Sequence, residues 1–222
     1  MPLAGWGDGP GDISGVSLLT RPFRQQKFLQ ALLLWLTALW LVTAIEPFDR
    51  SDWLLENLLV FIYAALLIAS YRRFAFSNLS YGLFGVFLSL HMVGAHYTYS
   101  EAPIGFWLQE VFDLSRNHYD RIVHFSFGLL IAYPFREFLL RVTGVRLEWS
   151  YLLVLVTVLG FSGFYEALEG VAAVIVSPEL GLAFLGTQGD IWDAQKDTAL
   201  AFSGAIIAMV VTRIADRHIR RI

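Results

Sequence analysis

Long apolar blocks alternate with short polar connections along this chain. The blocks cover residues 28–45, 53–70, 79–99, 119–140, 150–176 and 197–214. Each is close to the ~20 residues that an α-helix needs to cross the hydrocarbon core of a bilayer. Helices are expected because an open sheet in contact with lipid would leave its backbone polar groups without partners. The pattern therefore predicts an all-α integral membrane bundle of about six transmembrane helices.

The segment before the first block has a different character. Residues 1–20 are rich in glycine and aspartate and show little periodicity, which indicates a flexible N-terminal head. This segment lacks the basic start of a secretory signal peptide, and the first apolar block is too long for a signal core. Residues 21–222 are expected to form a single six-helix transmembrane domain. Within it, Gly160, Ser162 and Gly163 are expected to allow close contact between helices.

Basic residues are distributed unevenly between the two sides of this bundle. If the N-terminus is cytoplasmic, twelve of the 16 Lys and Arg residues fall on the cytoplasmic side. These are Arg21, Arg24, Lys27, Arg72, Arg73, Arg136, Arg141, Arg146, Arg213, Arg217, Arg220 and Arg221. The others, Arg50, Arg116, Arg121 and Lys196, fall outside. Because cytoplasmic connections carry an excess of Lys and Arg, the distribution predicts that both termini are cytoplasmic.

Composition narrows the class of protein further. Hydrophobic residues make up 56% and charged residues 16% of the chain, whereas soluble domains have about 45–50% and 25%. The formal net charge of −3 gives no indication of a nucleic-acid partner. The chain has no cysteine, so disulfides and thiolate metal sites are excluded. The lipid bilayer is the one partner that the composition requires, and the oligomeric state stays open.

Ionisable residues inside the spans are the first candidates for function, because an unpaired charge in a bilayer is costly. A rise of ~1.5 Å per helical residue converts their positions into depths. Nearly all fall in the outer third of the membrane, and the inner half has almost none. The ionisable residues considered are His91 and His96 on the third span, Asp120 and His124 on the fourth, Glu166 and Glu169 on the fifth, and Asp190, Asp193 and Asp197 at the start of the sixth. A chance distribution would not favour one depth on four helices.

Helical spacing also places these residues on common faces. The pairs Asp120–His124 and Glu166–Glu169 have i, i+4 and i, i+3 spacings. The aspartates of the sixth span form one stripe if its helix is already wound at Asp190. His91 and His96 are five residues apart and point to different sides, and His96 matches the common depth better.

Carboxylates and imidazoles without thiols suit a divalent cation such as zinc, manganese or iron. Zinc is the metal we expect first, because neutral imidazole is its commonest nitrogen ligand. The predicted metal ligands are His124, Asp120, Glu166, Asp193 and Asp197. Glu169 is expected to remain free as a general base for bound water, and His96 and Asp190 complete the polar cluster. A metal-free network of buried ion pairs, with Arg121 and Lys196 as counter-ions, explains the same pattern and stays open as an alternative.

Two classes of function follow from the depth of this cluster. One is a membrane-embedded hydrolase or transferase that acts on a lipid or lipid-linked envelope precursor, because the cluster lies at head-group level in the outer leaflet. The other is a non-enzymatic membrane protein, either a transporter with a protonatable outer gate or a partner of other envelope proteins. A transporter needs a polar route through the inner half, and the apolar inner half does not favour one.

Three ordered segments resemble the signature blocks of the YjdF family of inner-membrane proteins. They read HMVGAHYTYSEAPIG at residues 91–105, NHYDRIVHFSFG at 117–128 and FLGTQGDIWDAQKD at 184–197. The resemblance implies a multi-pass bacterial inner-membrane protein and supplies no activity. More distantly, Asp120, His124 and Phe125, followed by an aspartate-rich start to a later helix, are similar to the VanZ-like proteins, which are associated with glycopeptide-antibiotic resistance.

Overall fold

The computed structural model describes residues 22–71, 73–176, 181, 185 and 187–219, so the head expected at residues 1–20 lies outside the described part. All regular secondary structure in the described part is helical. The elements are the 3₁₀ turn η2 (Phe23–Gln25), α1 (Lys27–Thr43), α2 (Arg50–Tyr71), α3 (Asn78–His96), α4 (Pro103–Phe112), α5 (Tyr119–Phe138), the π-helical turn η3 (Leu139–Thr143), α6 (Leu147–Ile175) and α8 (Asp193–Ile219). The all-α class expected from the apolar blocks is confirmed.

Five of the described helices are long and apolar enough to cross a membrane. They are α2, α3, α5 with η3, α6 and α8. The remaining apolar helix, α1, is shorter, with 17 residues. These helices follow one another in the order of the apolar blocks, so the multi-pass membrane architecture expected from the sequence is confirmed.

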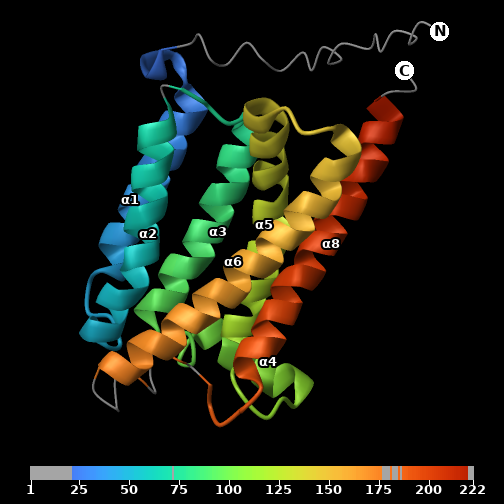
Figure 1. Ribbon diagram of the computed structural model, residues 1–222. Helices are drawn as coiled ribbons and strands as arrows, with labels where there is room; N and C mark the ends of the chain where they lie inside the picture. The colour runs from blue at the N-terminus through green and yellow to red at the C-terminus, as the bar shows by residue number, and fades with distance from the viewer. Residues whose placement is uncertain (1–21, 72, 177–180, 182–184, 186, 220–222) are drawn as a thin grey trace, which may run out of the picture.

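The long helices run side by side, and α6 crosses the bundle at an angle to its neighbours (Figure 1). The start of α1 and the end of α8 lie at the same end of the bundle. The distribution of basic residues predicts that this end is cytoplasmic, and we call it the cytoplasmic end. We call the opposite end, where α4 lies and where α5 and α8 begin, the outer end.

Glycines hold α5 and α8 in close contact. A Cβ on Gly128 of α5 would lie 1.7 Å from the carbonyl oxygen of Ala201 in α8. A Cβ on Gly204 of α8 would lie 2.2 Å from a backbone carbonyl oxygen of α5. Small residues of this kind let two membrane helices approach each other. The expectation of close contact is wrong for Gly160 and Gly163, because no described atom lies within 4 Å of a Cβ at either position, whereas Ser162 is buried.

Ionic groups near the cytoplasmic end are well supplied with partners. The buried Arg136 of α5 donates to Asp216 of α8 at 2.5 Å, and the hydroxyl of Tyr151 in α6 donates to the same carboxylate at 2.7 Å. Glu137 accepts hydrogen bonds from the backbone N–H and the hydroxyl of Ser77, both at 2.8 Å. Partially buried carboxylates with such partners are stable as charged groups, so this end has no evident need of a cation.

A short helix that the apolar blocks did not predict, α4, lies at the outer end (Figure 1). It begins with Pro103 and ends at Asp113, whose backbone is left-handed with φ 51°. Asn117 connects α4 with α5, since its amide donates to the Ala102 carbonyl oxygen at 3.0 Å and its side-chain oxygen accepts from the Tyr119 N–H at 3.0 Å. This bridge fixes the first turn of α5, where the candidate site begins.

Candidate metal centre at the outer end

Helices α5 and α8 form the centre of the candidate site. Asp120 and His124 lie one turn apart on α5, and Asp197 lies near the start of α8. One potential ligand atom from each of these side chains lies within 4.8 Å of the others. Nε2 of His124 is 3.4 Å from Oδ1 of Asp120. The close α5–α8 packing is therefore what brings an aspartate of one helix to an imidazole of the other.

Helix α6 adds two carboxyl groups to this centre. Oε1 of Glu166 is 3.4 Å from Nε2 of His124. Glu169, one turn further along α6, is buried and lines the same cavity as Glu166. Helix α6 therefore places two carboxyl groups on one wall of the cavity that His124 faces.

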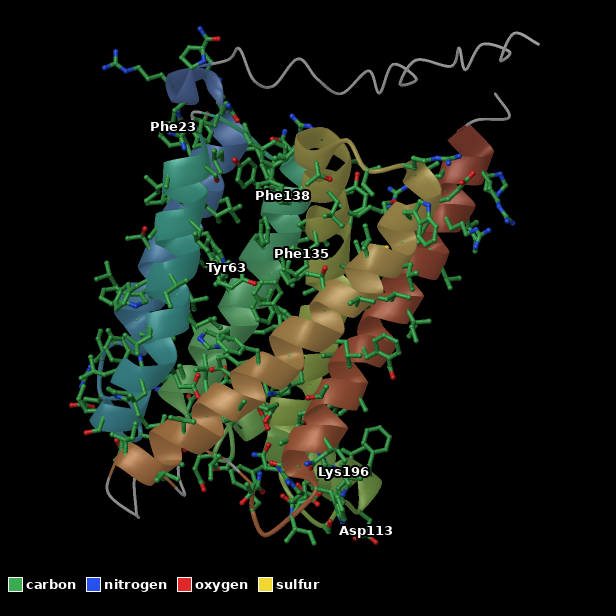
Figure 2. The ribbon with its side chains drawn as sticks, in the orientation of Figure 1. Phe23, Tyr63, Asp113, Phe135, Phe138 and Lys196 are labelled. Atoms are coloured by element: carbon green, nitrogen blue, oxygen red, sulfur yellow. The ribbon has the colours of Figure 1, made fainter. Side chains whose placement is uncertain are left out.

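These side chains converge on one acidic cavity. Its wall consists of residues from α2, α5, α6 and α8, from the turn after α3, and from the segment before α8. They are Glu56, Thr98, Tyr99, Asp120, Glu166, Glu169, Leu185, Asp193 and Asp197. Six of these nine residues are acidic, so the wall is rich in oxygen atoms that could bind a cation. In Figure 2, Lys196 and Asp113 mark the outer end of the bundle, where α8 begins.

Two carboxylate oxygens at this centre lack hydrogen-bond partners among the described residues. They are Oδ1 of Asp197 and Oε1 of Glu166, and both atoms are buried. Asp197 as a whole is 1% exposed. A buried carboxylate oxygen without a donor loses its hydration without compensation. A bound cation would remove this penalty, as the arginine and hydroxyl donors do at the cytoplasmic end.

The remaining aspartates of the cluster form ion pairs. Asp193 is 4% exposed, and its Oδ1 lies 2.6 Å from Nη1 of Arg116 and 3.2 Å from Nη2 of Arg121. Asp190 lies 2.5 Å from Arg121 and 2.6 Å from Nζ of Lys196. The hydrogen bond from the Lys196 ammonium, with further donors from the Trp192 backbone and Arg121, holds the pKa of Asp190 well below its usual range. The counter-ions proposed for a metal-free network thus engage these two aspartates.

A pair of hydrogen bonds holds the segment before α8 against the start of α5. The side-chain amide of Gln188 donates to the Asn117 carbonyl oxygen at 2.9 Å and accepts from the Asn117 N–H at 3.1 Å. Nη1 of Arg116 also donates to the Thr187 carbonyl oxygen at 2.7 Å. These contacts place the first turn of α8 beside Asp120.

His96 lies outside this group of residues. Its Nδ1 is 2.9 Å from the carbonyl oxygen of Thr43, and its ring meets the Tyr97 ring edge-on at 4.5 Å between centroids. His96 therefore connects the end of α3 with the end of α1 and is absent from the cavity wall described above. As expected from their five-residue spacing, the two histidines point to different sides of α3. The histidine that contacts a residue of the cavity wall is His91, through Tyr99.

Glu56 and Arg116 belong to the site, although neither was among the site residues predicted from the sequence. Glu56 is 2% exposed and accepts a hydrogen bond from the hydroxyl of Tyr165 in α6 at 3.2 Å. A signal was present, because Asp52 and Glu56 have i, i+4 spacing in the first turns of a span that begins outside. Arg116 had no such signal, since it lies in a connection whose path depends on α4.

Comparison with known proteins agrees with the membrane architecture. Residues 28–218 match the family model described as "Predicted membrane protein (DUF2238)". The chain is 39% identical over 188 residues to "Inner membrane protein YjdF" of Escherichia coli (strain K12), a match that covers 84% of this chain and 90% of that protein. No solved structure matches the chain significantly.

Proposed function

The chain belongs to the DUF2238 family of inner-membrane proteins, and we propose that it is a metal-dependent hydrolase or transferase that acts on a lipid or lipid-linked envelope substrate at the outer leaflet. One observation carries the proposal: ligand atoms of Asp120, His124 and Asp197 lie within 4.8 Å of one another in a cavity whose wall is acidic. A membrane protein has little reason to concentrate carboxylates in this way unless a cation or a proton is handled there.

His124 is the proposed anchor of a divalent cation, with zinc as the first candidate. Asp120 and Asp197 supply one carboxylate oxygen each. Glu166 offers the fourth position through Oε1, which lies 3.4 Å from Nε2 of His124 and accepts no hydrogen bond from the described residues. Imidazole and carboxylate ligands on three different helices suit zinc, manganese or iron. Asp193 was predicted as a ligand as well, but its ion pairs with arginine support a role in which it orients the start of α8.

The chemistry follows from what each residue of the cavity can do. A divalent cation held by these ligands would polarise an ester group and a water molecule. Glu169 is the proposed general base, because its carboxyl group is buried in the cavity wall, one turn of α6 away from Glu166. Burial of the surrounding carboxylates excludes bulk water, which strengthens each of these electrostatic interactions.

Position in the membrane supports a lipid substrate. The site lies in the first turns of α5 and α8, which begin at the outer end where head groups are found. Exposed aromatic residues of α4, Phe106 and Trp107, lie at the same end, and such residues favour the membrane interface. A transporter receives less support, because the α6–α8 contact towards the cytoplasm is formed by Val154, Val158 and Ala205, each with no exposed surface.

Elemental analysis of the purified full-length protein tests the proposal. The expected result is about one divalent ion per chain after removal of loosely bound metal, and loss of most of it in His124→Ala. His96→Ala is the matched control, since it removes a histidine at the same end but outside the cavity wall, and it should retain the ion. Wild-type protein that is free of metal as purified and after incubation with zinc, manganese and iron would reject the proposal and favour the ion-pair network.

A further inference from the structure

A buried tyrosine–histidine pair forms part of the cavity wall. Tyr99 is 9% exposed and lines the cavity beside its acidic residues. Its hydroxyl oxygen lies 2.5 Å from Nδ1 of His91, which is 1% exposed. Nε2 of His91 lies 3.0 Å from the backbone carbonyl oxygen of Glu56 in α2. The pair includes none of the metal ligands proposed above.

The hydrogen-bond partners fix the tautomer of His91. A carbonyl oxygen can only accept, so Nε2 of His91 carries the proton that is donated to Glu56. In a neutral imidazole Nδ1 is then an acceptor, and the Tyr99 hydroxyl donates to it. The ring is thus oriented on one side by the backbone of α2, and on the other side it can accept the proton of Tyr99.

Unusual backbone geometry places Tyr99 in the wall. Thr98 and Tyr99 have φ values of 49° and 53°, a left-handed conformation that residues with side chains rarely adopt. The Tyr99 N–H donates to the Gly94 carbonyl oxygen at 2.9 Å. The Tyr99 ring packs so closely on Gly94 that a Cβ there would lie 2.5 Å from it. Such backbone persists only where the surrounding structure enforces it, and it is concentrated at functional sites.

We propose that Tyr99 is a nucleophile of this cavity, activated by His91 and directed at an ester bond of the lipid substrate. The arrangement contains the parts that covalent catalysis requires: a hydroxyl group, a base within hydrogen-bond distance, and a third group that orients the base. The inference rests on the proposed function for its substrate and for the water that completes the reaction.

The reaction has two balanced steps. In the first, a bond forms between Oη of Tyr99 and the central atom of the ester, and the bond from that atom to the alcohol oxygen breaks. The proton of Tyr99 moves to Nδ1 of His91 and then to the departing alcohol oxygen. In the second, water attacks the tyrosyl ester, Glu169 accepts a proton from the water, and Oη of Tyr99 departs and recovers a proton from Glu169. The products are an acid and an alcohol, and each residue returns to its initial state.

Labelling with methanesulfonyl fluoride tests the nucleophile without a known substrate. An S–O bond forms with Tyr99, the S–F bond breaks, fluoride leaves, and the tyrosine proton passes to His91. Peptide mass spectrometry of full-length protein in detergent should show Tyr99 labelled at least roughly tenfold faster than Tyr119 at neutral pH. Tyr119 is the matched control, because it is also buried and its ring lies 6.2 Å from that of Tyr99, but its hydroxyl donates to the Leu90 carbonyl rather than to a base.

Two variants distinguish the reactivity of Tyr99 from the binding of a metal ion. His91→Gln should reduce labelling of Tyr99 to the level of Tyr119, and labelling should then rise only at strongly alkaline pH, because burial disfavours the ionised form of a tyrosine. His124→Ala should lose metal and still be labelled at Tyr99. Wild-type Tyr99 that reacts no faster than Tyr119 overturns the inference even when the metal is present, and this result does not depend on whether His91→Gln folds. Rapid labelling of a metal-free wild-type protein would support the nucleophile while it rejects the metal centre.

Discussion

Nε2 of His124 in α5 lies 3.4 Å from Oε1 of Glu166 in α6. The same imidazole is 3.4 Å from Asp120 and belongs to the compact group with Asp197 of α8. One histidine therefore connects three helices at the outer end. Because every helix contributes only one or two groups, the site exists only when the bundle is assembled, and changes in helix packing should affect it as directly as changes in its side chains.

Replacement of Glu169 by glutamine should abolish activity without loss of the fold. Glutamine keeps the shape of the side chain and removes the base, and loss of a general base lowers turnover by about 10²–10⁴-fold. The measurement is product formation from liposomes of bacterial lipid extract, followed by mass spectrometry, beside metal content and melting temperature. Glu110→Gln is the control, because Glu110 is exposed on α4. Full activity in Glu169→Gln would show that Glu169 is not the base.

Replacement of Gly128 by alanine should destabilise the bundle. The added Cβ would lie 1.7 Å from the Ala201 carbonyl oxygen, so α5 and α8 must separate. Overpacking of this kind costs about 1–3 kcal/mol, and the shift should also weaken metal binding by moving Asp197 away from His124. Thermal unfolding in detergent and metal content are the measurements. Gly160→Ala, where a Cβ meets no described atom within 4 Å, should be neutral or slightly stabilising, because alanine favours helix. Equal melting temperatures for the two variants would contradict the assigned packing.

The ion pairs of Asp190 predict a specific loss of stability in acid. The pKa of Asp190 is lowered in the folded protein, chiefly by Lys196, from the ordinary value of about 3.9. The unfolded chain therefore binds this proton more readily, so the contribution of Asp190 is complete above about pH 3.9 and is lost as the pH falls towards the lower pKa of the folded state. The melting temperature of the wild-type protein should fall as the pH is lowered through this range, and the melting temperature of Asp190→Asn should fall less steeply. Asp113→Asn, an exposed aspartate at the same end (Figure 2), should retain the wild-type slope. If Asp190→Asn kept the wild-type slope, the ion pairs of Asp190 would not contribute to stability in this pH range.

Orientation in the membrane is open to a direct test. The distribution of basic residues places the C-terminus in the cytoplasm. A reporter that fluoresces only in the cytoplasm, fused after Ile222, should therefore give a signal. Fusion of the same reporter within the connection between α1 and α2 should give none, because that connection is predicted to lie outside. A stable but dark fusion at Ile222 would reverse the assignment and place the acidic cavity at the inner leaflet.

The sequence by itself determined the architecture of this protein, because the information that specifies a membrane span is local. A span needs about 20 apolar residues in succession, and its depth scale follows from a fixed rise per residue. The positions of Asp120, His124 and Glu166 at one depth, and the i, i+4 contact between the first two, followed from the same rule.

Only the tertiary structure decided which of these groups meet. The rotation of a helix and its distance from its neighbours depend on packing between segments that are distant in sequence. The contacts of Gly128 and Gly204 set the distance between α5 and α8, whereas Gly160 faces open space. The path of the chain before α5 gives Asp193 an arginine partner, Arg116, that no helical spacing could indicate. Tyr99 reaches the cavity through a left-handed turn that ends α3, and a conformation of this kind is enforced by its surroundings rather than by the preference of the residue itself.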